Sequence, residues 1–415
     1  MQVTDEYVRL YTEAFRTTGI ASLLVLHVQA QQNKKDVVIK RSLKNSKYDK
    51  DTPPGFCNDA TPQICNVTTP EIKHDADELK VSEPMKHIIS EYRLFQPTEA
   101  IEFPTVPNGI PRIPHIVHQI CDSEEVLDIF ADPMRSFVEN NPTWEYRFWT
   151  YESGRNFLTQ RYPYLIEIYD AFGKNDVRKS DLLRFAVIYE YGGVYADLDV
   201  KNLRPLNITT IKYACIVPTE PFEHSAIFYR TEVLLSTAVL LCRPKHPFFK
   251  QLLLNLQFAD PGGEPLDTTG PMYVTNLYML YNNINATDMR KTKNDNSSNS
   301  PYFYKGTRRE DDDDAVYIPN SQYFMDSVDK SSFTKNRSLE DCIHKPKSTV
   351  NQIDLVLKNR ACNEFESRKT LRKDRTFTFT HHYWFHMWTF STKYLMMYEK
   401  KHIKDIIPNC ISFSE

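Results

Sequence analysis

The fold of this chain is decided by residues 180–199, which begin Ser180-Asp181-Leu182-Leu183-Arg184 and end Tyr191-Gly192-Gly193-Val194-Tyr195-Ala196-Asp197-Leu198-Asp199. Residues 178–191 carry a helical pattern, and the glycine pair that follows is a common helix end. Residues 194–200 then have the pattern of a strand. A helix that leads through two glycines into a strand indicates one step of an α/β fold.

Two pairs of charged residues lie within this stretch. Asp181 and Arg184 are three apart on the predicted helix, so they share one face, as a simple surface ion pair also would. Asp197 and Asp199 alternate with Leu198 on the predicted strand, so both carboxylates point the same way. Like charges on one face repel each other unless a cation or a ligand lies between them. Carboxylate oxygens suit Mg²⁺ or Mn²⁺, which commonly bridge protein carboxylates to substrate phosphates.

Strands and helices alternate on both sides of this stretch, which predicts an α/β sheet covered by helices on both faces. The predicted strands are residues 113–120, 146–149, 194–200 and 213–218. The predicted helices are residues 178–191, 246–258, 271–282 and 391–406.

Composition excludes several classes of protein. With 51 Lys and Arg against 54 Asp and Glu, the net charge is -3, and the clustered basic residues that nucleic-acid binding requires are missing. The sequence has only 11 glycines and none of the motifs of dinucleotide-binding, P-loop or α/β-hydrolase proteins. A hydrophobic fraction of 41% allows a conventional globular core.

Cysteines and glycosylation tripeptides favour the secretory pathway. The eight cysteines contain no C-x-x-C pair, which argues against a thiolate zinc site and leaves disulfides open. N-x-S/T tripeptides begin at Asn66, Asn207, Asn285, Asn296 and Asn336. We therefore expect a secretory glycoprotein.

The N-terminal part differs in composition from the rest. Residues 20–28 form an apolar run of signal-peptide length that is too short to span a bilayer, and an amphipathic helix is the alternative. We expect residues 1–30 to be a signal or anchor segment through which the protein could associate with a membrane. The remaining divisions are a stem at 31–105 and a folded domain at 106–415, with a surface insertion at 283–314.

Further segments resemble glycosyltransferase family 32, the D-x-D enzymes typified by the fungal initiating α-1,6-mannosyltransferase. Residues 113–119, Ile-Pro-His-Ile-Val-His-Gln, look like the family's opening strand, and residues 141–149 look like its N-P-to-W segment. Thr269-Gly270-Pro271 looks like its later helix start. The resemblance covers residues 111–275, and the D-x-D spacing is also similar to that of the large glucosylating bacterial toxins.

The resemblance implies a GT-A fold, a UDP- or GDP-hexose donor, a Mn²⁺ or Mg²⁺ ion and a glycan or glycolipid acceptor. In related enzymes the positions of Asp181 and Arg184 hold donor ribose and hexose, and that of Asp197 contacts sugar and metal. The position of Asp199 ligates the metal directly. The donor-binding set implied for this chain is His118, Gln119, Trp149, Asp181, Arg184, Tyr195, Asp197 and Trp388, with Asp197, Asp199 and Arg184 as the catalytic residues.

A C-terminal run, residues 381–388, looks like the family's closing H-H-W-x-x-S-W segment when His382, Trp384 and Trp388 are aligned. The family's serine falls on Met387 and breaks the match, so the metal contact expected there is assigned to either His382 or His386. We expect residues 376–390 to close over the donor, with Trp388 directing its indole N–H at the diphosphate. An aromatic core strand and a zinc site lacking a third ligand are the alternatives.

These expectations combine into a metal-dependent retaining hexosyltransferase of the Golgi lumen, transferring α-mannose, galactose or N-acetylglucosamine. Two other functions stay open: an inactive sugar-nucleotide-binding or glycan-binding protein on the same fold, and a metal-dependent phosphoester hydrolase, which needs a denser Asp/His cluster. Glu220, Glu223 and His224 follow the predicted 213–218 strand as weaker candidates, either at a pocket edge or as ordinary loop residues.

Overall fold

The computed structural model describes residues 97, 99–173, 176–231, 233–285, 312–329, 352–371, 376–386 and 398–413. These residues belong to a compact unit that spans Lys86–Glu415. The predicted signal or anchor segment at 1–30, most of the stem, and the interior of the 283–314 insertion lie outside the described residues. Within the described ranges, no helix combines the length and the apolar character needed to cross a membrane.

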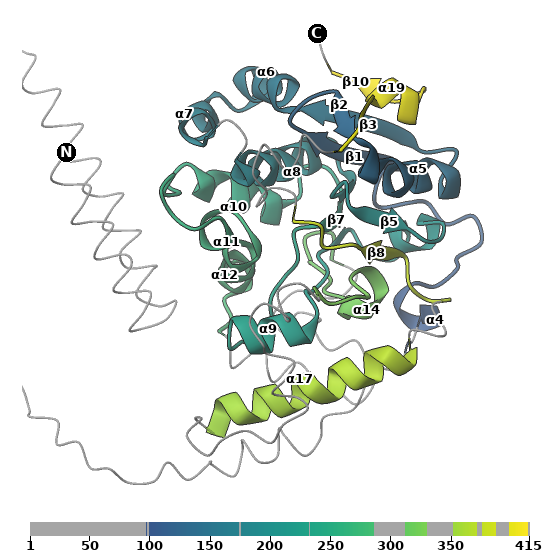
Figure 1. Ribbon diagram of the computed structural model, residues 1–415, viewed down its shortest axis with the longest axis vertical. Coiled ribbons are helices and arrows are strands. Elements are labelled where there is room, and N and C mark those ends of the chain that lie inside the picture. Colours follow the sequence, from purple (N-terminus) through teal and green to yellow (C-terminus); the bar gives the residue numbers. More distant parts are fainter. Residues whose placement is uncertain are drawn as a thin grey trace, which may run out of the picture. The chain divides into compact units, whose positions relative to one another are not determined.

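A mixed six-stranded sheet in the order β10-β3-β1-β4-β7-β6 organises the fold (Figure 1). Its strands are β1 (Ile116–Cys121), β3 (Glu145–Thr150), β4 (Gly193–Ala196), β6 (Cys215–Ile216), β7 (Val239–Cys242) and β10 (Ile411–Ser412). Strands β10, β3, β1 and β4 run parallel, whereas β7 runs antiparallel to both of its neighbours. The four residues of β4 are all buried, as expected for a central strand with helices on both faces.

Helices cover both faces of this sheet, and Figure 1 shows α6, α7, α8 and α10 gathered on one side with α5 and α19 on the other. Their bounds are α5 (Ala131–Asn140), α6 (Tyr151–Arg161), α7 (Ile166–Ala171), α8 (Val177–Tyr191), α10 (Pro247–Leu256), α12 (Pro271–Asn282) and α19 (Ile403–Ile406). The predictions of helices at 178–191, 246–258 and 271–282 are confirmed, with α8 and α10 differing by one or two residues at an end. The predicted α/β class is confirmed as well.

The passage from α8 into β4 depends on the two glycines. Gly192 has φ of 65° and Gly193 has φ of 95°, a region that other residues rarely adopt. A Cβ on Gly193 would lie 2.5 Å from the carbonyl oxygen of Ile116, and a Cβ on Gly192 would lie 2.7 Å from the ring of Pro244. Glycine at these two positions therefore lets α8 end and lets β4 lie close to β1 directly afterwards.

One predicted strand is wrong at its most important position. Residues 194–200 do not form one strand, because β4 ends at Ala196 and the amide of Val200 donates to the carbonyl of Asp197 at 3.0 Å. Residues 197–199 therefore form a tight turn, which aspartate favours, and Leu198 packs against the core. The chain continues as β5 (Val200–Asn202), which pairs with β8 (Thr380–His382) in a separate two-stranded sheet.

The C-terminal helix predicted at 391–406 is also wrong for its described part. Residues Lys400–His402 form β9, which pairs antiparallel with β2 (Glu125–Leu127), and only Ile403–Ile406 is helical. Pairing with a strand far away in the sequence overrides the local helical pattern. The predicted strand at 213–218 is shortened to the two residues of β6.

The core of the unit includes residues from the predicted stem. Phe103 is 1% exposed and packs edge-on against Tyr323 and Phe379, with ring centroids 5.1 and 5.2 Å apart. It directly follows the short helix α4 (Glu99–Glu102). The folded unit therefore extends upstream of residue 106.

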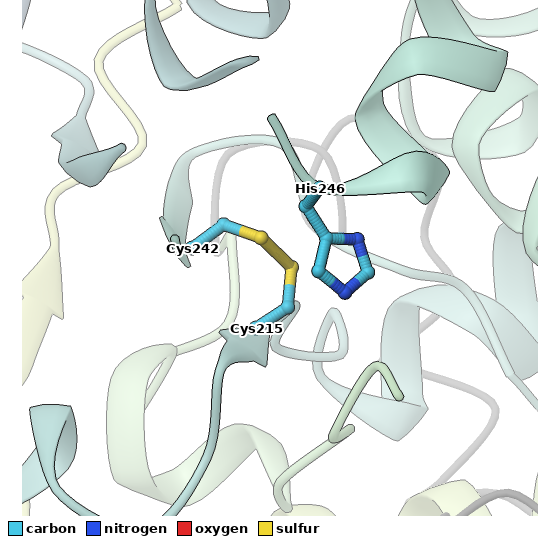
Figure 2. A group of neighbouring side chains, drawn as sticks. All are labelled: Cys215, Cys242 and His246. Atoms are coloured by element: carbon cyan, nitrogen blue, oxygen red, sulfur yellow. A yellow bond between two sulfur atoms is a disulfide. The ribbon is translucent and has the colours of Figure 1, made fainter. Parts of the chain in front are cut away.

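A disulfide joins Cys215 and Cys242, which face each other on β6 and β7. Figure 2 shows the sulfur–sulfur bond with the ring of His246 beside it. These three residues are close enough to be considered as metal ligands. Because the sulfurs are bonded to each other, neither is the thiolate that a metal requires. A disulfide of this kind persists in oxidising compartments.

Candidate active site

The candidate site lies beyond the carboxyl end of β4, where α/β proteins commonly bind ligands. The turn after β4 carries Asp197 and Asp199, and the first half of α8 carries Asp181 and Arg184. Residues 380–386, from β8 onward, complete the site from the C-terminal part of the chain.

Arg184 connects three parts of the site while being only 3% exposed. Its guanidinium lies 3.1 Å from a carboxylate oxygen of Asp181 and 3.2 Å from one of Asp197. It also donates to the carbonyl of Thr237 at 2.7 Å and covers the ring of Tyr195 at 4.6 Å. The prediction that Asp181 and Arg184 share a face is confirmed. They are not a surface pair, because both are buried.

Asp181 has a partner that the sequence did not indicate. Thr269 donates its hydroxyl to a carboxylate oxygen of Asp181 at 2.5 Å. Burial raises the pKa of Asp181, although Arg184 and Thr269 act in the opposite direction. The sequence predicts only a helix start at Thr269-Gly270-Pro271, and nothing local to this segment indicates the contact with Asp181.

Asp197 is fixed from two sides. Its carboxylate accepts a hydrogen bond from the hydroxyl of Tyr195 at 2.5 Å, and its backbone carbonyl accepts one from the amide of Gln119 at 3.2 Å. Burial raises the pKa of Asp197; Arg184 lowers it, and the neighbouring charge of Asp199 raises it further. The opposing influence of Asp199 is the like-charge repulsion expected from the sequence.

Asp199 is held by the C-terminal segment. One carboxylate oxygen lies 3.0 Å from Nε2 of His382, and the other accepts the amide of Phe385 at 2.9 Å. The amide of Tyr383 donates to the Asp199 carbonyl at 3.0 Å. Burial opposes ionisation of both groups, but their attraction outweighs it: the pKa of Asp199 is lowered and that of His382 is raised.

The segment after β8 has an unusual backbone. Trp384 and His386 have φ of 59° and 49°, in the left-handed region. The indole N–H of Trp384 donates to the carbonyl of Ser327 at 2.9 Å, and its ring lies 4.0 Å from that of His382. His386 instead lies 2.9 Å from a carboxylate oxygen of Asp329. The predicted diphosphate contact, Trp388, lies outside the described residues, as does Met387.

The donor set fits a divalent cation. One carboxylate oxygen from each of Asp197 and Asp199 and a ring nitrogen of His382 all lie within 4.8 Å of one another. Carboxylate oxygens and an imidazole nitrogen are both ligands of divalent metal ions. Of the two histidines considered, His382 belongs to this group and His386 does not.

Residues His118, Gln119 and Trp149 form the floor of the site and are almost completely buried. The indole N–H of Trp149 donates to Nδ1 of His118 at 3.2 Å, so Nε2 carries the proton and donates to the carbonyl of Gly192 at 2.9 Å. Burial lowers the pKa of His118 to about 3. The side-chain oxygen of Gln119 accepts a hydrogen bond from the hydroxyl of Tyr146. Its side-chain amide donates to the carbonyl of Asp197 in the DXD turn, residues 197–199. Their polar atoms thus hold protein groups in place, and the geometry offers none of them as a free base contact.

Comparison with known proteins agrees with this geometry. Residues 130–216 match the family described as "Glycosyltransferase sugar-binding region containing DXD motif". Over these residues the chain is similar to the DXD glycosyltransferases. The matched segment includes Asp181, Arg184 and the DXD turn itself, and the mixed sheet that carries the turn is a GT-A-like α/β fold, as predicted.

Two curated proteins that are similar to this chain come from yeasts. It is 30% identical over 179 residues to "Inositol phosphoceramide mannosyltransferase 2" of Schizosaccharomyces pombe, covering 42% of this chain and 48% of that protein. It is 26% identical over 183 residues to "Mannosyl phosphorylinositol ceramide synthase SUR1" of Saccharomyces cerevisiae, covering 43% of this chain and 45% of that protein. The matched region spans about half the length of these relatives.

A solved structure described as "PaToxG Glycosyltransferase" is 14% identical and covers 42% of this chain and 71% of that chain, with a TM-score of 0.32. This TM-score is too low to indicate that the two proteins share the arrangement of the site.

Proposed function

We propose that this protein is a metal-dependent glycosyltransferase that moves a hexose from a nucleotide sugar to an acceptor hydroxyl, with retention of the donor's α configuration. The observation that carries this proposal is the group of Asp197, Asp199 and His382 beside the buried Arg184. The names of the fungal relatives favour mannose as the hexose and inositol phosphoceramide, a glycolipid precursor, as the acceptor.

Mn²⁺ or Mg²⁺ would be held by Asp199, Asp197 and His382. When bound, such an ion neutralises charge on the diphosphate leaving group. His382 would serve as a ligand in its neutral form, in which one ring nitrogen has a free lone pair. The resemblance to family 32 supports this assignment of the metal.

The chain's own residues would position the donor. The planar guanidinium of Arg184 is suited to binding the oxygen atoms of the donor. Asp181 holds the guanidinium in place through an ion pair with Nη2. Tyr195 holds Asp197 in one orientation by its hydroxyl. His118, Gln119 and Trp149 would act as the supporting floor instead of contacting the base, and Trp388 stays a proposed contact to the diphosphate.

Retention would follow from attack on the same face that the leaving group departs from. The bond between the acceptor oxygen and the anomeric carbon forms as the bond from that carbon to the phosphate oxygen breaks. The acceptor proton passes to the departing phosphate, which then serves as the base. No carboxylate nucleophile is required by this scheme.

A lumenal location, such as the Golgi, agrees with three observations. The Cys215–Cys242 disulfide needs an oxidising compartment, and exposed Asn207 begins a glycosylation tripeptide. The fungal relatives are named as enzymes of glycolipid synthesis. We include an N-glycan at Asn207 in the proposal.

The test is nucleotide release from GDP-mannose, UDP-galactose and UDP-N-acetylglucosamine, with MnCl₂, MgCl₂ or EDTA, and with or without inositol phosphoceramide. We expect release that depends on Mn²⁺ and increases with acceptor, and an NMR coupling pattern of an α linkage in the product. Nucleotide binding without cleavage would favour the inactive sugar-nucleotide-binding protein. Phosphate release from simple phosphoesters would favour the hydrolase.

Asp199→Asn gives the sharpest variant for this test. It removes one ligand oxygen and one negative charge together, so activity should fall by about 100-fold or more. Asp132→Asn is the matched control, because Asp132 forms an exposed ion pair with Lys201 at 2.7 Å. Such surface pairs contribute at most about 1 kcal/mol, so this control should transfer sugar as the wild type does. Equal activity in the two variants would exclude the metal role of Asp199.

A further inference from the structure

Two glutamates near the start of α9 (Phe222–Phe228) are buried in different ways. Glu223 has a side chain that is 1% exposed and binds Arg368 through both oxygens, at 2.8 and 3.0 Å. Arg368 lies on α17 (Gln352–Leu371), which runs along α9 at the lower edge of Figure 1. Glu223 is therefore a buried charge with a full cationic partner.

Glu220 lacks such a partner. Its side chain is 8% exposed, and one carboxylate oxygen lies 3.1 Å from Nδ1 of His224. Within the parts of the chain that the structure describes, neither Lys nor Arg pairs with Glu220, and its second oxygen accepts no hydrogen bond. A buried carboxylate without a cation or a full set of donors is costly to keep in a folded protein.

The imidazole beside Glu220 is neutral, because the structure fixes its tautomer. The backbone amide of Asp329 donates to Nε2 of His224 at 2.8 Å. An amide can only donate, so Nε2 carries no proton and Nδ1 carries the single one. That proton is directed to Glu220, which it orients without neutralising the negative charge.

Glu220 and His224 lie next to the DXD centre. The ring of His224 packs edge-on against Trp384 at 4.6 Å, and Trp384 in turn lies 4.0 Å from His382. Glu220 is within electrostatic range of His382 and of Tyr229, a residue that is 37% exposed. Burial raises the pKa of Tyr229 to about 12, and the charge of Glu220 adds to that shift. A carboxylate and an accessible aromatic ring thus adjoin the centre.

We infer that Glu220 binds a hydroxyl group of a sugar or cyclitol ring in the active site and that His224 positions it. A hydroxyl supplies the donor that the second oxygen lacks, and hydrogen bonds to a charged acceptor are stronger than those between neutral groups. Tyr229 offers a ring face for the apolar side of the same sugar. This inference rests on the proposed glycosyl transfer, and the hydroxyl belongs either to the transferred hexose or to the acceptor.

The experiment compares Glu220→Gln with Glu223→Gln. Glutamine at 220 keeps an oxygen for His224 and removes the charge, so we expect a loss of about 10- to 100-fold in kcat/KM for transfer. Its melting temperature should equal or exceed that of the wild type, because an uncompensated buried charge is gone. Glu223→Gln should melt at a lower temperature, because it leaves Arg368 buried without its carboxylate.

Two assays identify the source of the hydroxyl. If only the KM for inositol phosphoceramide rises, the hydroxyl is the acceptor's. If GDP-mannose cleavage in the absence of acceptor falls equally, the hydroxyl belongs to the hexose. Unchanged kinetics in Glu220→Gln, or a loss of activity that accompanies a lower melting temperature, would overturn the inference.

Binding of GDP with MnCl₂, followed by calorimetry, separates this inference from the proposed function. Wild type and Glu220→Gln should bind equally well, because the diphosphate and the metal do not involve Glu220. Absence of Mn²⁺-dependent binding in the wild type would instead contradict the proposed function itself.

The positioning role of His224 has its own readout. Asn places an amide N–H where Nδ1 stands, so His224→Asn should recover part of the activity that His224→Ala loses. In a Glu220→Ala background, which leaves no side-chain oxygen at position 220 to position, His224→Ala and His224→Asn should not differ. A difference that persists there would show that His224 acts only on packing.

Discussion

The floor of the site and the carboxylate centre, formed by Asp197 and Asp199, each have a buried histidine, and the two histidines differ in their hydrogen bonds. His118 in the floor has both ring nitrogens engaged by Trp149 and Gly192, and burial lowers its pKa to about 3. His382 in the centre faces Asp199 through Nε2, while its Nδ1 makes no hydrogen bond to the described residues. His118 therefore supports the fold, whereas His382 keeps a ring nitrogen that is available for chemistry.

Arg184 should give the largest effect, because it is the buried cation that faces both Asp181 and Asp197. Arg184→Ala leaves Asp181 and Asp197 buried without their cation, which we expect to cost about 3–5 kcal/mol of unfolding free energy, as for other broken buried pairs. Urea unfolding measures this loss. Arg184→Lys keeps the charge without the fork, so it should fold well and still transfer sugar poorly. A stable and active Arg184→Ala would break the comparison.

The second largest effect should be a difference in Mn²⁺ requirement between variants of His382 and His386. His382→Ala should raise the Mn²⁺ concentration needed for half-maximal activity by at least about 10- to 100-fold, the range seen when even an outer-shell partner of a metal ligand is lost. His386→Ala is the matched control, since His386 pairs with Asp329 outside the metal group. Titrating MnCl₂ against both variants decides the matter, and an equal requirement would remove His382 from the metal site.

A smaller effect, on stability alone, is expected in the floor. His118→Leu leaves the Trp149 N–H and the Gly192 carbonyl without their partner, at a cost of about 1–3 kcal/mol per unsatisfied group. The melting temperature should fall while the Mn²⁺ requirement is unchanged. A shifted Mn²⁺ requirement would show that the floor takes part in metal binding.

The smallest expected effect is a dependence of stability on pH that arises from Glu364 on α17. Burial raises the pKa of Glu364 to about 7, although Arg368 opposes the shift. The unfolded carboxyl titrates near 4.5, so the folded chain holds this proton more tightly and the unfolding free energy rises as the pH falls from about 7. Glu364→Gln should remove that dependence and raise the melting temperature near pH 8 by on the order of 2–4 °C. A wild-type stability that rises with pH across this window would contradict the assignment.

The sequence predicted what local patterns control. The bounds of α12, the end of α8 at the glycine pair and the pairing of Asp181 with Arg184 follow from helical spacing and a glycine stop. The predicted strand at Asp197–Asp199 is wrong because alternation of polar and apolar residues fits a strand and a short turn equally well. Only the bond from Val200 to Asp197 distinguishes them.

Long-range contacts account for the rest. The choice between His382 and His386 depends on the pairing of β8 with β5, which no local pattern encodes. Thr269 is buried against Asp181, which is far away in the sequence. Glu220 is buried beside His224, whose ring packs against the equally distant Trp384. An isolated hydroxyl or carboxylate in a loop carries no such signal.

The separation of Asp199 and His382 along the chain has a consequence for biosynthesis. The two residues are 183 positions apart, which at about 5–20 residues per second leaves roughly 10 to 40 s between their synthesis. During that interval a nascent chain has the acidic turn but neither the imidazole nor the Phe385 amide that hold it. A chain that is truncated in this interval therefore has an intact DXD motif and an incomplete metal centre.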